Sequence, residues 1–126
     1  MVSMANRLQS DPKLLDTCLD VVIRFKAHGN YKDEAGALKA LRRRAPALPP
    51  EQYRFWLDLL CRVYDRALSA IERHRVRAAA RRSRLAHPDD IDHQACLAEL
   101  DEIAPGLAKR QKEKILSWVI YWHYLR

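Results

Sequence analysis

Residues 50–71 read PEQYRFWLDLLCRVYDRALSAI, a stretch without glycine and with proline only at its first position. Its apolar residues recur at steps of three and four positions, which is the period of an α-helix that buries one face. They are Tyr53, Trp56, Leu57, Leu60, Tyr64, Ala67 and Ile71. Because proline is favoured at the first helical position, we expect this helix to begin at Pro50. The same periodicity allows one continuous helix from Pro50 to Arg84, or a bend between Ile71 and Arg75.

The rest of the chain also has a helical pattern. Glycines number only three, β-branched residues are few, and the prolines separate long proline-free runs. Further helices are expected over about residues 12–28, 32–44, 90–103 and 108–125, with His87-Pro-Asp-Asp capping the third of them. The sequence therefore predicts an all-α fold of five to six helices, packed as a compact bundle with a long central helix. Residues 1–126 are expected to form a single domain.

A shift of 59 positions aligns two parts of the chain without a gap. The turns and inward leucines coincide: Asp33 with Asp92, Leu38 with Leu97, Leu41 with Leu100, Ala45-Pro46 with Ala104-Pro105, and Leu48 with Leu107. We interpret residues 27–66 and 86–125 as two copies of a helical hairpin with an APxL corner. The alternative is that two unrelated helix–turn–helix segments use the same turn residues.

Positive charge is concentrated in one segment. The net charge is +7, and residues 73–84, RHRVRAAARRSR, hold six arginines and no acid. On one helix, a stripe outside the apolar face would carry Arg62, Arg66, Arg73, Arg77, Arg81 and Arg84. Arg75 and Arg82 fall in the apolar sector instead. Because burying them unpaired is costly, we expect the helix to leave the core beyond Ile71.

The six arginines outside the apolar face, from Arg62 to Arg84, form what we call the arginine ridge. It is a candidate site for an anionic partner. That partner is an acidic protein surface or the phosphates of a nucleic acid. The segment has no aromatic residue for base stacking, which argues against a reader of single strands. The alternative is a plain solvated face, or neutralisation by acids between Asp89 and Glu102.

Residues 114–126, KILSWVIYWHYLR, are apolar on nearly every side of a helix. Where the first hairpin has Asp58, Arg62 and Asp65, the second has Ser117, Tyr121 and Tyr124. Aromatic residues dominate protein contact sites, so a protein interface or dimer contact is predicted here. Its residues are Trp118, Tyr121, Trp122 and Tyr124. The alternative is a terminal core helix whose tyrosine hydroxyls reach water.

No pattern indicates catalysis. His93 and Cys96 have the spacing of half a zinc site, but a second pair is missing, and there is no glycine-rich phosphate loop. We therefore expect no enzyme activity, no cofactor, no metal and no small-molecule substrate. Three widely spaced cysteines and no signal peptide or membrane span suggest a cytoplasmic protein.

The preferred hypothesis is a non-enzymatic protein-binding module, which acts as a regulator, adaptor or inhibitor of a partner protein. The alternative is a nucleic-acid-binding protein that contacts phosphates through residues 73–84.

Overall fold

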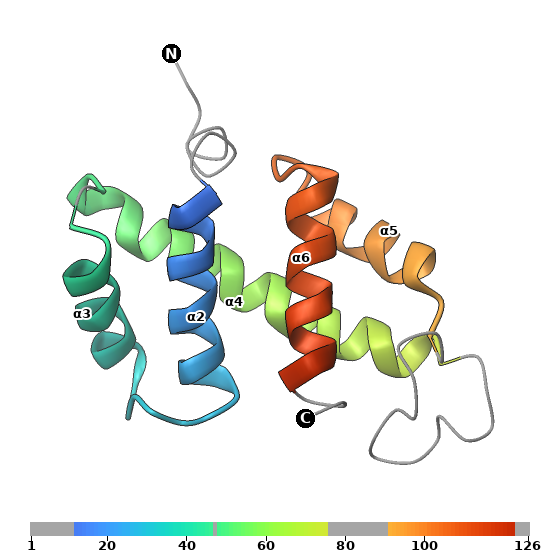
Figure 1. The fold of residues 1–126 in the computed structure, drawn as a ribbon, viewed down its shortest axis with the longest axis horizontal. Helices are drawn as coiled ribbons and strands as arrows, with labels where there is room; N and C mark the ends of the chain where they lie inside the picture. Colours follow the sequence, from blue (N-terminus) through green and yellow to red (C-terminus); the bar gives the residue numbers. More distant parts are fainter. Residues whose placement is uncertain (1–11, 47, 76–90, 123–126) are drawn as a thin grey trace. The chain divides into compact units, whose positions relative to one another are not determined.

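The computed structural model describes residues 12–46, 48–75 and 91–122. These ranges hold five α-helices: α2 (Pro12–Lys26), α3 (Glu34–Arg44), α4 (Pro50–Arg73), α5 (His93–Ile103) and α6 (Lys109–Ile120) (Figure 1). They hold no strand, only one isolated antiparallel bridge between Arg75 and Ile91. The predicted all-α class with a long helix beginning at Pro50 is confirmed. Within the described ranges, no helix combines the length and apolar character needed to cross a membrane.

The chain divides into two compact units, and the boundary falls within α4. Unit 1, Met1–Arg62, contains α2, α3 and the first half of α4. Unit 2, Val63–Arg126, contains the second half of α4 together with α5 and α6. The expectation of a single domain stays a prediction.

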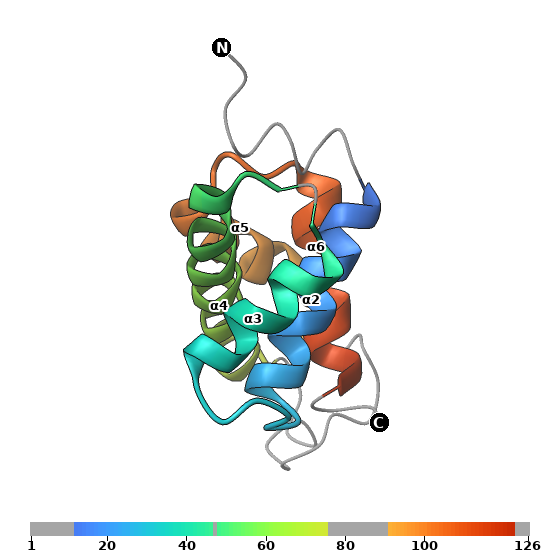
Figure 2. The ribbon, with the colours of Figure 1, turned by 90° about the vertical axis from the view of Figure 1, so that its left-hand side faces the viewer.

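Unit 1 is built on the packing of α2 against α3 (Figure 2). The amphipathic pattern of α2 buries Leu15, Cys18, Leu19 and Val22, and α3 buries Ala37, Leu38 and Leu41. From α4, Trp56 and Leu60 are fully enclosed. The hydroxyl of Tyr53 donates a buried hydrogen bond of 2.7 Å to the carbonyl oxygen of Ala45, which ties the start of α4 to the end of α3.

Unit 2 is built on the packing of α5 against α6. Its core takes side chains from all three of its helical segments: Val63, Ala67, Ala70 and Ile71 of α4, Cys96, Leu97 and Leu100 of α5, and Ile115, Leu116, Val119 and Ile120 of α6.

The two hairpins match locally at the predicted shift of 59 residues. Asp33 caps α3 by accepting a 2.9 Å hydrogen bond from the amide of Gly36, and Asp92 caps α5 through the amide of Ala95 at 3.1 Å. Both helices have 11 residues, and both end at an alanine whose amide bonds the carbonyl of a buried leucine four residues before it. The APxL corners share the bond from the leucine amide to the first alanine carbonyl, at 3.3 and 3.1 Å. These matches support the repeat, which stays a prediction for the hairpins as a whole.

The end of α4 decides between the two alternatives left open by the sequence. The helix stops at Arg73, between Ile71 and Arg75, and is not continuous to Arg84. The amide of Asp92 donates a 2.8 Å hydrogen bond to the carbonyl of His74, and Arg75 bridges to Ile91, so tertiary bonds replace the next helical turn. The cap of α5 is Asp92, two residues after the expected His87-Pro-Asp-Asp segment, all of which lies outside the described residues.

Arg75 was expected away from the core, but its side chain is only 9% exposed. This burial is tolerated because its guanidinium forms an ion pair of 2.6 Å with Glu72, one turn earlier.

The aspartate caps predict matched mutational effects. Asp33→Ala and Asp92→Ala should each lower the free energy of unfolding by about 1 kcal/mol, since each removes the acceptor for a helix N-terminal amide. Asp33→Asn and Asp92→Asn keep an acceptor and should cost much less. Urea unfolding at neutral pH measures both pairs, and an asparagine as costly as alanine would contradict the capping role.

Candidate functional site

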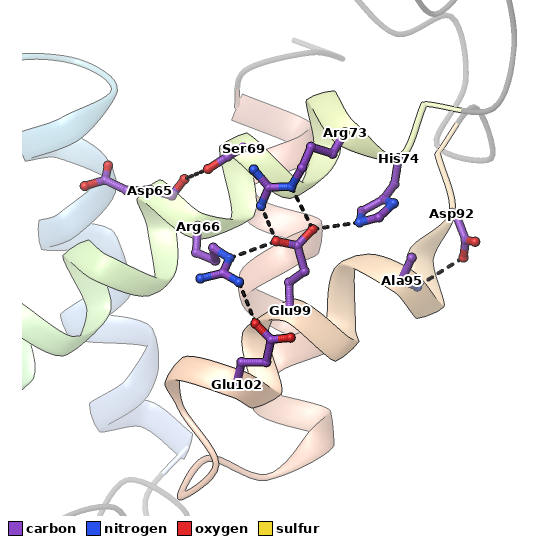
Figure 3. Close-up of polar contacts among 9 residues, drawn as sticks. All are labelled: Asp65, Arg66, Ser69, Arg73, His74, Asp92, Ala95, Glu99 and Glu102. Carbon is purple, nitrogen blue, oxygen red and sulfur yellow. Dashed lines mark hydrogen bonds and ion pairs between the residues drawn. The ribbon is translucent and has the colours of Figure 1, made fainter.

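A cluster of charged side chains forms around Glu99 of unit 2, which we call the Glu99 cluster (Figure 3). It consists of Arg66, Arg73, His74, Glu99 and Glu102. Arg66 and Arg73 are seven residues apart on α4, so they lie on the same helix face two turns apart. Glu99 and Glu102 are three apart on α5 and also share a face. Periodicity therefore brings two arginines opposite two glutamates.

Arg66 bridges the two acids. Its Nε donates a 2.8 Å hydrogen bond to Glu99, and its Nη2 donates one of 2.6 Å to Glu102. Arg73 holds the Glu99 carboxylate with a two-pronged contact: its Nε lies 3.1 Å from Oε2, and its Nη2 contacts Oε1. Such forked pairs are stronger and more directional than single contacts.

His74 completes the cluster, with its Nε2 2.6 Å from Oε2 of Glu99. The hydrogen bond from Arg73, followed by those from Arg66 and His74, lowers the pKa of Glu99 to about 2 against the opposing effect of desolvation. Glu99 is therefore ionised at neutral pH and can only accept hydrogen bonds, so the proton in this contact belongs to Nε2 of His74.

The structure separates the residues of the predicted arginine ridge. Arg66 and Arg73 are engaged by the glutamates of α5. Arg62 is exposed, and its Nε contacts the backbone of Asp58 at 3.4 Å. Arg77, Arg81 and Arg84 lie outside the described residues. Arg66 and Arg73, the second and third arginines of the ridge, therefore satisfy an internal acid.

A basic surface that the sequence reasoning missed lies on α3 instead. Arg42 and Arg43 lie in the last turn of α3, where positive charge also favours the negative end of the helix dipole. Together with Lys39 they are exposed; Lys39 and Arg43 lie opposite the buried Ala37, Leu38 and Leu41, and Arg42 lies beside that face. We call Lys39, Arg42 and Arg43 the α3 stripe. Their spacing of three and four residues was the available signal.

The residues of the predicted aromatic interface lie at and just beyond the C-terminal end of α6. Tyr121 is 53% exposed, and its ring packs edge-on against Trp122 with ring centroids 5.2 Å apart. Trp118 and Trp122 are half-buried, and Tyr124 lies outside the described residues. Within the described ranges, Tyr121 and Phe55 are the large apolar side chains that are classed as exposed.

Two of the three cysteines, Cys18 and Cys96, are unsuited to nucleophilic chemistry. All three are free, and Cys18 and Cys96 are buried. Burial raises the pKa of the Cys18 thiol to about 12, and burial together with Glu99 and Asp92 raises that of Cys96 to about 11. In the described part of the chain, no three His, Cys, Asp or Glu side chains are grouped so that they could hold a metal ion.

Comparison with protein-family models, curated protein sequences and solved structures finds no significant match. The interpretation therefore depends on the residues of the chain itself.

The Glu99 cluster predicts a pH-dependent contribution to stability. Glu99→Gln should lower the free energy of unfolding by about 2 kcal/mol at pH 7, because it removes the negative charge and replaces one of the two accepting oxygens, which face charged donors, by an NH2 group. The folded-state pKa of Glu99 is lowered from 4.5 to about 2, so this contribution is present above the unfolded pKa. It is lost as the pH falls through about 2. Urea unfolding of wild type and variant between neutral pH and pH 2 measures the difference.

Glu102→Gln is the matched control, since Glu102 is 65% exposed and contacts only one arginine of the cluster. Its cost should stay below about 1 kcal/mol, as for exposed ion pairs. Equal costs for the two variants, or a Glu99→Gln difference that does not change with pH, would contradict the electrostatic role of Glu99.

Proposed function

We propose that this chain is a non-enzymatic protein-binding module that contacts a partner protein through the aromatic end of α6. The supporting observation is the exposure of Tyr121 beside the half-buried Trp118 and Trp122. Aromatic side chains offer a large contact area at a small cost in side-chain entropy, and they are enriched among the residues that dominate binding energies. The partner is a second protein or a second copy of this chain, which would make a dimer.

We further propose that the module acts as a regulator, adaptor or inhibitor in the cytoplasm. The free thiols of Cys18, Cys61 and Cys96 are compatible with a reducing compartment.

Nucleic-acid binding through residues 73–84 is the competing function. The pairing of Arg66 and Arg73 with Glu99 weighs against it, because a phosphate would have to displace an acid already held by forked contacts. Arg77, Arg81 and Arg84 remain candidate phosphate contacts on sequence grounds alone.

The aromatic end of α6 predicts a selective loss of binding. Tyr121→Ser should reduce capture of a partner protein by tenfold or more, as expected when a central aromatic contact worth about 2 kcal/mol is removed. Phe55→Ser, which removes the exposed aromatic side chain of unit 1, is the matched control and should retain capture. The measurement is affinity capture from lysate of the native organism after nuclease treatment, quantified by mass spectrometry, with sedimentation velocity to detect a dimer. If Tyr121→Ser captures and self-associates as wild type does, the proposed interface is wrong.

The competing function has its own test. If the arginine segment binds nucleic acid, replacing Arg77, Arg81 and Arg84 by glutamine should reduce the slope of log affinity against log salt by about three. On our proposal, wild type binds a DNA duplex only non-specifically, with a Kd of about 10 µM or weaker at physiological salt. Tight duplex binding that is lost in the triple variant would replace the proposed function.

A further inference from the structure

The positive charge of the described chain is concentrated in unit 1. Its described residues include ten basic and six acidic side chains, whereas those of unit 2 include seven of each. Among the described residues, unit 1 therefore has four surplus positive charges and unit 2 has none; residues 76–90, which the structure does not describe, add four arginines and two aspartates to unit 2. A local surplus of this kind favours an anionic partner.

Some cations of unit 1 form ion pairs with acids, and the surplus charge lies on those that do not. Arg44 pairs with Asp20, and Arg54 pairs with Glu34 at 3.0 Å. In the described ranges, no acid pairs with Lys39 or Arg43. The guanidinium of Arg42 lies over the ring of Tyr53, 5.9 Å from its centroid, which positions the cation without neutralising it. The α3 stripe is thus an exposed set of cations whose charge unit 1 leaves unbalanced.

The equivalent helix of unit 2, α5, has acidic residues at the positions of two of these cations. Fifty-nine residues after Arg42 and Arg43 stand Asp101 and Glu102 of α5, with opposite charge. Both acids are taken up inside unit 2, because Asp101 receives Lys112 and Glu102 receives Arg66. In unit 2, therefore, acids on one helix face pair with cations of neighbouring helices. In unit 1 the charges of this face are reversed and the acidic counterpart is missing among the described residues.

We propose that the α3 stripe binds an acidic helix of a partner protein, with carboxylates spaced one turn apart. This inference rests on the proposed protein-binding function and adds a second surface with a defined partner chemistry. Lys39, Arg42 and Arg43 span about 6 Å along the helix axis, which matches the distance between carboxylates three or four residues apart on a facing helix. Arginine forks also match single carboxylates in geometry. A nucleic acid would meet only about three cations here, too few for firm binding at physiological salt.

The test uses the full chain and defined probes. The first probe is a labelled, alanine-based peptide of about 18 residues, long enough to form a helix, with four glutamates on one face at positions i, i+3, i+4 and i+7. The second has the same composition with its glutamates spread around the helix. The third is a DNA duplex of about 20 base pairs, and all are measured by fluorescence anisotropy at about 50 mM salt, where charge interactions are weakly screened.

The stripe variant is Lys39→Gln combined with Arg43→Gln. Its control is Lys109→Gln combined with Arg110→Gln, which removes two exposed positive charges from α6 of unit 2. We expect the one-face peptide to bind wild type at least tenfold more tightly than the stripe variant, and the control to remain within twofold of wild type. Far-ultraviolet circular dichroism verifies that both variants are folded.

Four outcomes would overturn the inference: no binding of the one-face peptide, equal binding of the spread peptide, equal losses in the two variants, or tighter binding of the duplex. Tyr121→Ser should bind the peptide as wild type does, because Tyr121 is not a residue of the α3 stripe and belongs to the other unit. If the one-face peptide does not bind while Tyr121→Ser still reduces partner capture, the inference about the α3 stripe is wrong and the proposed α6 interface stands. If the peptide binds through the α3 stripe while Tyr121→Ser leaves capture unchanged, the proposed α6 interface is wrong and the inference about the α3 stripe stands.

Discussion

The burial of one face of α4 is the constraint on which both units depend. Trp56 and Leu60, with no exposed surface, belong to the core of unit 1, and Val63, Ala67 and Ile71 are equally enclosed in unit 2. Each of these groups is only part of a core, because the neighbouring helices of its own unit supply the rest. A polar substitution on this face would remove apolar burial and add an unsatisfied group, both of which are strongly destabilising. Among the described residues, the outward faces leave other side chains available, notably the exposed cations of α3 and Tyr121 at the end of α6.

Electrostatics distinguish the two units more than packing does. In unit 2, Glu99 gathers Arg66, Arg73 and His74, so that cations which look available in the sequence are committed to an internal acid. In unit 1 the cations of the α3 stripe have no such acid among the described residues. A protein can hold many arginines and offer few of them to a partner. The pairing pattern, more than the count, decides which surface attracts an anion.

Local signals in the sequence predicted the fold well. Period-three-and-four patterns placed the helices, and Pro50 marked the start of α4. The 59-residue shift aligned Asp33 with Asp92, which the structure shows at equivalent caps, although the cap of α5 had been expected at His87-Pro-Asp-Asp. The end of α4 could not be predicted in this way. Between Glu51 and His87 the chain has no glycine or proline to stop a helix, and the stop at Arg73 comes from bonds between residues 74–75 and 91–92. Such bonds join distant parts of the chain, and no local pattern encodes them.

The candidate sites were predicted only in part for the same reason. The spacing of Arg66, Arg73, Glu99 and Glu102 was visible, but which acid meets which arginine depends on how α4 and α5 pack. The α3 stripe was missed because positive charges are common in the last turn of a helix, where they favour the helix dipole, and the sequence does not show which of them lack an acidic partner. The most direct test is an amide-detected NMR titration of the full chain with the one-face acidic peptide. Our account predicts chemical-shift changes centred on residues 39–43, whereas changes centred on Arg66 and Arg73 would contradict it.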